Sequence, residues 1–465
     1  MEKPGTLGAL RDSGYRHRSV REEMRHNLAL RLQRNEPLFT GIVGFDETVI
    51  PEIENALLAG HHMVFLGERG QAKSRIIRSL VALLDAEVPA VAGCAIHDDP
   101  ERPICKSCRE RAAALGDALP IEWIDRSRRY GEKLATPDVS IADLIGEVDP
   151  IKVAEGRYLA DEDTIHYGLI PRTNRGIFAI NELPDLTEKV QVGLFNLMEE
   201  KDVQIKGYKI RLPLDIVVVA SANPEDYTSR GRIITPLKDR FDAQIRTHYP
   251  RRLEDEMAIM MQEIPALERF DRVVHMPPFL KEIIAQFTFE ARACAEINQA
   301  SGVSVRVTIS NYESVISNAE KRALRLGEPE VVPRISDLHA LFASTAGKIE
   351  VEYSGEERKE TDIIDRLLQR AIVKVFDKYL KVDDLKSVIA YFEGGWGVQV
   401  GDGMRADEYL DGVKAIPGLR EAIVVLGHVE SPGFIAAASE FIFEGLHLHQ
   451  KLNKDTEGGR ATYRT

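Results

Sequence analysis

The chain has 465 residues, of which 44% are hydrophobic and 29% are charged, and its net charge is −13. This length predicts two or three domains, and the composition is typical of globular proteins. The negative charge argues against nucleic-acid binding. No apolar stretch is long enough to span a membrane or to form a signal peptide, so we expect no membrane association and a cytoplasmic location. With only four cysteines, a disulfide framework is not expected.

The N-terminal 34 residues are basic, with eight Lys and Arg residues against four Asp and Glu residues. We expect residues 1–18 to be poorly ordered. Ser19 and Glu22 form a capping-box signature, which predicts a helix that runs to about residue 34. Residues 1–38 are therefore predicted to form a basic helical arm, either solvated or in contact with an acidic neighbour.

The rest of the chain is organised around residues 64–74, which read VFLGERGQAKS. An apolar run, a glycine loop and an apolar-periodic segment follow one another, which predicts strand, loop and helix. The stretch fits the phosphate-binding pattern G-x-x-x-x-G-K-[ST], except that Ala72 replaces the second glycine. Lys73 would reach the β- and γ-phosphates, and Ser74 would reach Mg²⁺. The loop backbone would surround the phosphates through Gly67, Glu68, Arg69, Gly70, Gln71 and Ala72. The alternative is a glycine turn before an ordinary helix.

A cysteine-rich stretch at residues 93–120 has the spacing of a structural zinc site. The four candidate ligands are Cys94, His97, Cys105 and Cys108. Two pairs with two residues between their members can present four side chains to one tetrahedral ion. Asp98 or Asp99 could take the place of His97. Free thiols or a redox pair are the alternatives.

Polar residues follow two further apolar runs. The run at residues 177–180 ends in Asn181 and Glu182, and the run at 214–221 leads to Asn223. In an open parallel sheet, ligands bind at the carboxyl ends of the strands. Glu182 could therefore activate the water that attacks the γ-phosphate, and Asn223 could hold that water or the phosphate. The alternative is two strands that end in solvated polar residues.

The remaining segments are less informative. Residues 138–175 predict a helix, an excursion and a turn, and residues 203–211 predict a β-hairpin. Helices dominate from residue 251 to about 395. Residues 394–403 predict a glycine-rich break, and mainly helical sequence follows it. We expect the last dozen residues to be frayed.

Taken in order, these motifs resemble the AAA+ ATPases, and within them the magnesium-chelatase I and MoxR-type branch, over residues 39–348. The resemblance implies an ATP site with Mg²⁺. It assigns Lys73 and Ser74 to Walker A, Glu182 to Walker B and Asn223 to sensor 1. Arg240 matches the arginine finger that acts on a neighbouring subunit's nucleotide.

The resemblance also covers the accessory segments. Residues 138–175 look like the helix-2 insert of this branch, and residues 203–211 look like its sensor-1 hairpin. The stretch after Cys108 is similar to one found in chelatase I subunits. For sensor 2 there are two candidates, Arg306 and Arg334, of which we favour Arg306. One position departs from the family pattern: Asn181 stands where the Walker B aspartate is usual, so Mg²⁺ would be held more weakly.

The predicted fold is an α/β P-loop AAA+ domain at residues 39–250, a helical lid at 251–385 and a helical extension at 386–465. The predicted function is ATP hydrolysis in a homo-oligomeric ring, with a hexamer expected. Hydrolysis would remodel a partner protein, which the resemblance suggests has a von Willebrand A-type domain. The alternatives are a slow ATP-dependent switch or scaffold, because of Asn181, and a subunit of a magnesium or cobalt chelatase.

Overall fold

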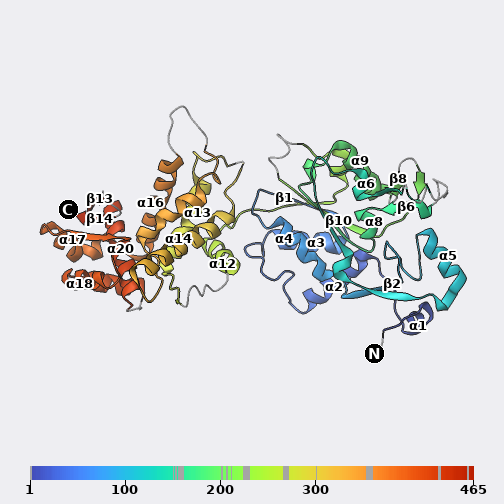
Figure 1. Ribbon diagram of the computed structural model, residues 1–465, viewed down its shortest axis with the longest axis horizontal. Helices are drawn as coiled ribbons and strands as arrows, with labels where there is room; N and C mark the ends of the chain where they lie inside the picture. Colours follow the sequence, from blue (N-terminus) through green and yellow to red (C-terminus); the bar gives the residue numbers. More distant parts are fainter. Residues whose placement is uncertain are drawn as a thin grey trace. The chain divides into compact units, whose positions relative to one another are not determined.

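The computed structural model describes residues 3–149, 151, 154, 162–200, 203–205, 208–210, 212–223, 231–264, 272–299, 301–351, 360–427, 431–457 and 460–465. The chain divides into two compact units, Met1–His248 and Tyr249–Thr465. The first is an α/β unit and the second is mainly helical (Figure 1). In the described part of the chain, no helix combines the length and apolarity that a bilayer crossing requires.

The first unit is built on a five-stranded sheet with the strand order β11-β1-β10-β7-β4. All four neighbouring pairs are parallel. The strands are β1 (Met63–Leu66), β4 (Tyr130–Leu134), β7 (Gly176–Asn181), β10 (Ile216–Ala222) and β11 (Ala243–Arg246). Every residue of β7 and β10 is buried, as expected for central strands of a parallel sheet covered on both faces.

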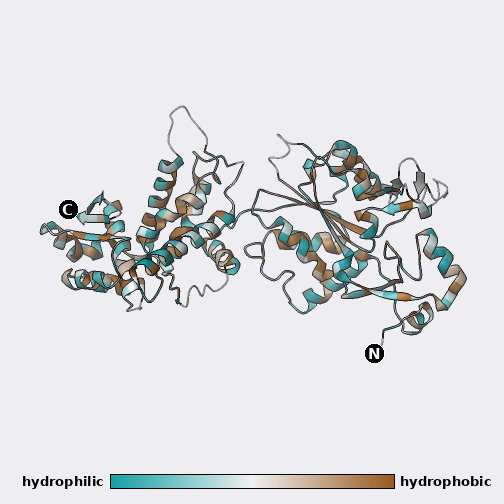
Figure 2. Cartoon of the chain, in the orientation of Figure 1, coloured by the Kyte–Doolittle hydropathy of each residue, from teal (hydrophilic) through white to brown (hydrophobic). Residues whose placement is uncertain are grey.

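Alternate residues of these strands feed two separate hydrophobic clusters. Val217 and Val219 pack with helices α2, α3 and α4, whereas Val218 and Ala220 pack with α9 on the opposite face. In the hydropathy view the helices carry both brown and teal residues, as expected for helices that pack one face against the sheet (Figure 2). The helices of this unit are α1 (Leu7–Asp12), α2 (Val20–Gln33), α3 (Val49–Ala59), α4 (Lys73–Ser79), α5 (Lys106–Leu115), α6 (Ile141–Leu144), α8 (Leu169–Arg172), α9 (Glu188–Glu200) and α11 (Thr235–Asp239).

Among the described residues of this unit, three small two-stranded sheets accompany the central one. Strand β2 (Glu87–Val91) pairs antiparallel with β3 (Ile121–Asp125). The expected hairpin is confirmed as β8 (Val203–Ile205) and β9 (Tyr208–Ile210). Within the expected insert, β5 (Gly146–Val148) pairs with β6 (Ile165–Tyr167), and residues 150, 152–153 and 155–161 between them lie outside the described part of the chain.

The N-terminal segment is ordered, so the expectation of disorder is wrong for residues 3–18. Helix α1 buries Leu7 and Leu10, an apolar pair too short to show a period in the sequence. Helix α2 begins with the predicted capping box of Ser19 and Glu22. One face of α2 is buried. Its Glu23 forms a buried ion pair with Arg129, whose guanidinium donates one hydrogen bond to each carboxylate oxygen. The basic arm is therefore packed against the α/β unit along this face.

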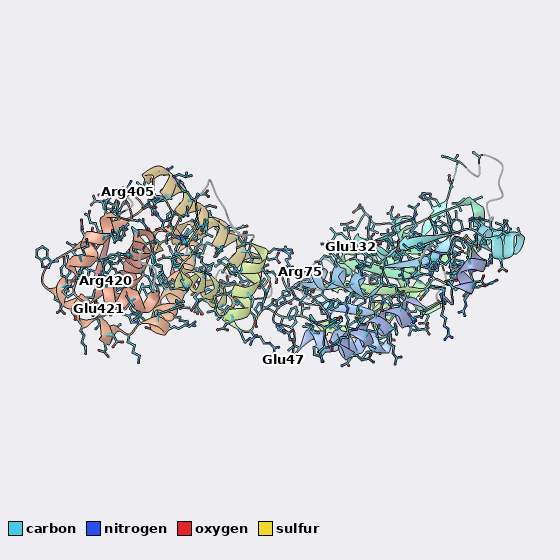
Figure 3. All side chains as sticks on the ribbon, turned by 90° about the horizontal axis from the view of Figure 1, so that it is seen from below. Glu47, Arg75, Glu132, Arg405, Arg420 and Glu421 are labelled. Carbon is cyan, nitrogen blue, oxygen red and sulfur yellow. The ribbon has the colours of Figure 1, made fainter. Side chains whose placement is uncertain are left out.

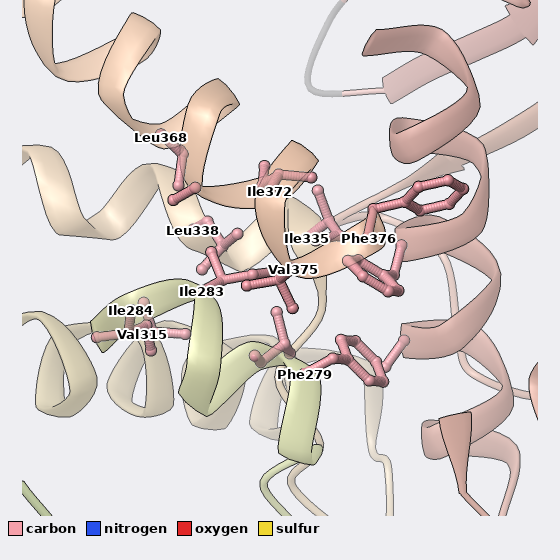
Figure 4. Packing of buried hydrophobic residues seen from close by; sticks show 14 of the residues in the cluster. Phe279, Ile283, Ile284, Val315, Ile335, Leu338, Leu368, Ile372, Val375 and Phe376 are labelled. Atoms are coloured by element: carbon pink, nitrogen blue, oxygen red, sulfur yellow. The ribbon is translucent and has the colours of Figure 1, made fainter. Parts of the chain in front are cut away.

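The larger hydrophobic cluster of the second unit reaches from Met260 to Tyr463, and Ala319, Ala323 and Val331 form a small separate one. Its helices are α12 (Leu253–Glu263), α13 (Pro278–Ala293), α14 (Val305–Leu326), α15 (Leu341–Thr345), α16 (Glu360–Tyr379), α17 (Lys386–Glu393), α18 (Glu408–Ala415), α19 (Leu419–Leu426) and α20 (Pro432–Leu448). Residues of α13 and α16 interdigitate in this core (Figure 4). Phe279 of α13 stacks on Phe441 of α20 with 4.5 Å between ring centroids, so helices before and after residue 385 share one interior.

The C-terminal region is not entirely helical. Strands β12 (Val398–Gly401), β14 (Arg460–Arg464) and β13 (Asn453–Glu457) form an antiparallel sheet in that order. The expectation of a glycine-rich break at 394–403 missed β12, and the expectation of frayed terminal residues is wrong for those described. The terminal strand β14 is held in place by Tyr463, because the ring of this residue is buried and its hydroxyl donates to Glu444 of α20.

Candidate nucleotide-binding site

The glycine loop connects β1 to α4 and is tethered to a neighbouring strand. The Thr247 hydroxyl, just beyond β11, donates to Gln71 Oε1 at 2.7 Å. The same oxygen accepts from the Glu68 amide at 3.1 Å. A Cβ on Gly67 would lie 2.0 Å from Thr247 Oγ1 and 2.2 Å from Gln71 Oε1, so only glycine fits there. The shape of the loop is thus fixed by Gln71 within it and by Thr247 beyond β11.

Ala72 explains how the loop tolerates the missing second glycine. Its backbone lies in the left-handed region, with φ 57° and ψ 11°, immediately before α4. This conformation costs an alanine about 1 kcal/mol, whereas glycine adopts it freely. The sequence departs from the motif at Ala72, but the backbone conformation there is one that suits glycine.

Lys73 and Ser74 lie at the start of α4. The Lys73 ammonium is buried and donates to the carbonyl oxygens of Gly67 and Glu68, the latter at 2.7 Å. The Ser74 hydroxyl donates to Asn181 Oδ1 at 3.3 Å. Both side chains therefore face the carboxyl ends of the central strands.

The carboxyl ends of β7 and β10 are joined by hydrogen bonds to Ser221. The Glu182 amide donates to the Ser221 hydroxyl at 3.2 Å, and that hydroxyl lies 3.4 Å from Asn181 Oδ1. Glu182 has φ 56° and ψ 48°, a strained conformation for a residue other than glycine. Such strain is concentrated at functional positions, and here it sets the direction of Glu182 directly after a buried strand.

Asn223 follows β10 and is 1% exposed. Its Oδ1 atom is buried, and none of the residues that the structure describes donates a hydrogen bond to it. A buried amide oxygen without a donor is costly. A water molecule that donates a hydrogen bond could satisfy this atom, which would suit the sensor-1 role that the resemblance assigns to Asn223.

Glu132 was missed by the sequence analysis, because β4 reads YGEKL and shows no apolar run. It is an edge strand with few buried residues. Asn181 Nδ2 donates to Glu132 Oε1 at 2.5 Å, and the two ends of the Arg78 guanidinium donate to the same carboxylate, both at 2.9 Å. The hydrogen bonds from Arg78 are the main cause that lowers the pKa of Glu132. Figure 3 labels this residue on the first unit.

Arg240 caps the end of α11 and contacts α9. Its side chain is 37% exposed, forms an ion pair with Glu199 and lies 5.5 Å from the centroid of the Phe195 ring. The two sensor-2 candidates differ in their exposure to solvent. Arg306 is exposed in the first turn of α14, whereas Arg334 is fully buried and donates to Glu328 at 2.6 Å and to the Met404 carbonyl at 2.9 Å.

The cysteine stretch brings together three of its four predicted ligands. One atom each of Cys94, Cys105, Cys108 and Asp98 lie within 4.8 Å of one another, so Asp98 and not His97 is the fourth member. The backbone turns at His97, where φ is 53°. Thiol hydrogen bonds from Cys105 and Cys108 lower the pKa of Cys94, and burial raises the pKa of Asp98 to about 6.

No protein-family model matches the chain. It is 28% identical over 321 residues to the magnesium-chelatase 38 kDa subunit of Acidiphilium rubrum, a match that covers 66% of this chain and 83% of that subunit. It is 29% identical over 251 residues to the magnesium-chelatase subunit ChlI of Nostoc sp., covering 52% of this chain and 61% of that subunit.

Among solved structures, the chain matches the complex between subunits BchI and BchD of magnesium chelatase, with 19% identity and a TM-score of 0.35. That match covers 70% of this chain and 98% of the other. The sequence relatives confirm the resemblance drawn from the motifs. The chain is a homologue of the magnesium-chelatase I subunits over the matched residues.

Proposed function

We propose that this protein binds ATP with Mg²⁺ at residues 67–74 and hydrolyses it to drive a change in a partner protein. The observation that carries the proposal is the position of Lys73, Ser74, Glu182 and Asn223 beyond the carboxyl ends of three adjacent strands, β1, β10 and β7. The relatives support ATPase chemistry of the chelatase type at a general level. The cytoplasmic location expected from the sequence stays a prediction.

The residues fit the proposed ligand. Lys73 would exchange the loop carbonyls for the β- and γ-phosphate oxygens, and Ser74 would hold the metal ion, which neutralises phosphate charge when bound. Glu182 would take a proton from the attacking water, and Asn223 Oδ1 would hold that water in line. The loop amides from Gly67 to Ala72, including those of Glu68, Arg69, Gly70 and Gln71, would surround the phosphates.

The site is proposed to be completed across a subunit boundary in a homo-oligomeric ring, for which the resemblance predicts a hexamer. Arg240 is exposed enough to leave Glu199 and reach a neighbouring subunit's nucleotide. Arg306 is proposed as sensor 2, because Arg334 is held in a buried ion pair and would have to unpair to reach any ligand. The proposal of a partner with a von Willebrand A-type domain rests on the resemblance alone.

The nucleotide assignment can be tested with two variants. Lys73→Ala should abolish ATP binding, and Glu182→Gln should bind ATP but stop hydrolysis, as measured with a fluorescent nucleotide and by phosphate release. Lys414→Ala, an exposed lysine on the second unit, is the matched control. If both site variants hydrolysed ATP at the wild-type rate, the site assignment would be wrong.

Two other functions remain open, each favoured by one observation. Asn181 favours a slow switch, which single-turnover measurements would reveal as tight binding with little hydrolysis. The sequence relatives favour a subunit that helps insert Mg²⁺ or Co²⁺ into a tetrapyrrole. Adding the protein to a chelatase reaction that lacks its I subunit tests this, and restored metal insertion would support it.

We also propose a structural zinc ion held by the three sulfurs and Asp98. Asp98 Oδ1 is buried and has no partner among the described residues, and its Oδ2 accepts from the Ile104 and Cys105 amides at 3.1 and 2.9 Å. Sulfur and carboxylate ligands are both compatible with tetrahedral zinc. The role would be to fix the start of α5, because Cys105 caps that helix.

Metal analysis of the purified protein tests this site and its fourth ligand. Wild type should carry one zinc per chain, Cys105→Ser should lose it, and Asp98→Ala should weaken retention against a chelator more than His97→Ala does. Cys294→Ser removes a buried cysteine outside the cluster and is the control. Equal effects of the Asp98 and His97 variants would contradict the assignment of Asp98.

A further inference from the structure

The carboxylate that Asn181 lacks is present one strand away. In the parallel pairing of β4 with β7, Leu134 is opposite Asn181 and Glu132 is opposite Ala179. The Glu132 side chain reaches along the strand edge and accepts from Asn181 Nδ2 at 2.5 Å. Asn181 is 9% exposed and the Glu132 side chain 21% exposed, so the contact is largely shielded from water.

This contact fixes which way the amide points. An ionised carboxylate only accepts hydrogen bonds, so the NH₂ group of Asn181 must face Glu132. Its Oδ1 atom is then directed at the hydroxyls of Ser74, at 3.3 Å, and Ser221, at 3.4 Å. An aspartate at position 181 could not donate to Glu132. The amide is therefore the residue type that this pair of neighbours requires.

Arg78 keeps Glu132 ionised and in place. It lies one helical turn after Ser74 on α4, and its guanidinium donates to both carboxylate oxygens at 2.9 Å. The Tyr130 hydroxyl adds a third donor at 3.1 Å to Glu132 Oε2. A continuous chain of contacts thus runs from Arg78 through Glu132 and Asn181 to Ser74.

We propose that Glu132, held by Arg78, fixes the Asn181 amide so that its Oδ1 atom takes the acceptor role that an aspartate at position 181 would have toward Ser74 and the metal ion of a nucleotide bound there. Glu132 is a positioning residue, because it acts through Asn181 and not on the nucleotide itself. The inference rests on the proposed nucleotide site and deepens it. The Glu132–Asn181 pair replaces a single aspartate.

Because aspartate is usual at this position, the simplest expectation is that Asn181→Asp strengthens binding of the metal ion. The proposal predicts the opposite. That change would set two carboxylates at hydrogen-bond distance, and two like charges this close cannot both stay ionised without moving apart. The variant should therefore bind the magnesium complex of ATP less tightly. The exchange Asn181→Asp with Glu132→Gln keeps one carboxylate and one amide, with a donor still facing an acceptor. It should restore binding.

The test is the affinity for ADP and for a non-hydrolysable ATP analogue, measured by calorimetry with Mg²⁺ and with excess EDTA. Glu132→Gln and Asn181→Asp should each reduce the gain in affinity that Mg²⁺ provides by about tenfold, or about 1.4 kcal/mol. The double exchange should return the gain in affinity that Mg²⁺ provides to within about threefold of the wild-type gain. Affinity in EDTA should change little in all three variants. Glu52→Gln, an exposed residue on α3, is the carboxylate-to-amide control.

The outcomes separate this inference from the proposed function. If wild type fails to bind either nucleotide, both proposals are wrong. If wild type binds but Glu132→Gln keeps the full Mg²⁺ dependence, or Asn181→Asp alone strengthens it, only the role of Glu132 is overturned. Thermal unfolding without nucleotide checks that each variant folds. If a single variant does not fold, the double variant still tests the proposed pairing of Glu132 with Asn181. A double variant that folds but binds nucleotide without Mg²⁺ dependence would contradict that pairing.

Discussion

Two charged networks, one in each unit, differ in their exposure to water. In the first unit, the Arg78–Glu132–Asn181 chain lies at the sheet edge, with 64% of the Arg78 side chain and 21% of the Glu132 side chain exposed. In the second unit, Arg322, Arg334, Glu328 and Asp337 form a network in which no side chain is more than 5% exposed. Groups that retain access to water can exchange partners for a ligand, whereas fully buried pairs cannot do so at low cost.

This difference separates two arginines that look alike in the sequence. Arg306 and Arg334 each stand at the beginning of a helical segment and each was a candidate for sensor 2. Arg306 is exposed on α14, but Arg334 donates to Glu328 and lies 5.0 Å from the centroid of the Tyr409 ring. We therefore predict that replacing Arg306 lowers catalytic activity and that replacing Arg334 lowers stability.

The largest expected effect is that of Arg334→Ala on the second unit. Removing one partner of a buried ion pair leaves a carboxylate uncompensated, which destabilises by about 3–5 kcal/mol. Glu328 keeps Arg322 at 2.7 Å, which places the effect toward the lower end of that range. Urea unfolding followed by circular dichroism measures it. Arg420→Ala, an exposed arginine on α19, is the control and should change stability little.

A small loss of stability in Arg334→Ala, together with a large loss of ATP turnover in the folded protein, would contradict the comparison. It would mean that the buried network rearranges to release Arg334 during the reaction. The measurement should therefore include phosphate release below the urea concentration at which unfolding begins.

Much of the fold was readable from the sequence, because its signals are strong and local. The run at 177–180 and the one at 214–221 are β7 and β10, and Ser19 with Glu22 forms the predicted capping box. Elements stabilised by distant partners were missed. Strand β4 has a polar sequence and forms by pairing with β7, and β14 depends on the burial of Tyr463.

The candidate site shows the same limit. Its motif residues were found because their spacing within each segment is fixed. Glu132 was not, because nothing in YGEKL indicates that its carboxylate meets an amide 49 positions later in the chain. Asp98 was kept only as a possible substitute for His97, since the positive φ of His97 that turns Asp98 toward the sulfurs has no signature in a histidine.

Arg306→Ala should have the second-largest effect, and on activity alone. Removing a cation that stabilises developing phosphoryl charge costs roughly 100-fold in turnover. Stability should change by less than about 0.5 kcal/mol, because the side chain is exposed. Phosphate release and urea unfolding on the same preparation measure both. If Arg306→Ala hydrolysed ATP at the wild-type rate, the assignment of Arg306 as sensor 2 would be wrong.

The smallest expected effect concerns the glycine loop, where the first unit holds backbone strain. Ala72→Gly should stabilise the protein by about 0.5 kcal/mol, because release of the left-handed strain exceeds the entropy that glycine adds to the unfolded chain. Ala113→Gly on α5, where the backbone is helical, is the matched control and should destabilise by about 1 kcal/mol. Opposite signs in thermal unfolding would show that position 72 favours glycine for its backbone. If both variants lost the same stability, the left-handed conformation at Ala72 would carry no cost, and the loop would tolerate alanine for another reason.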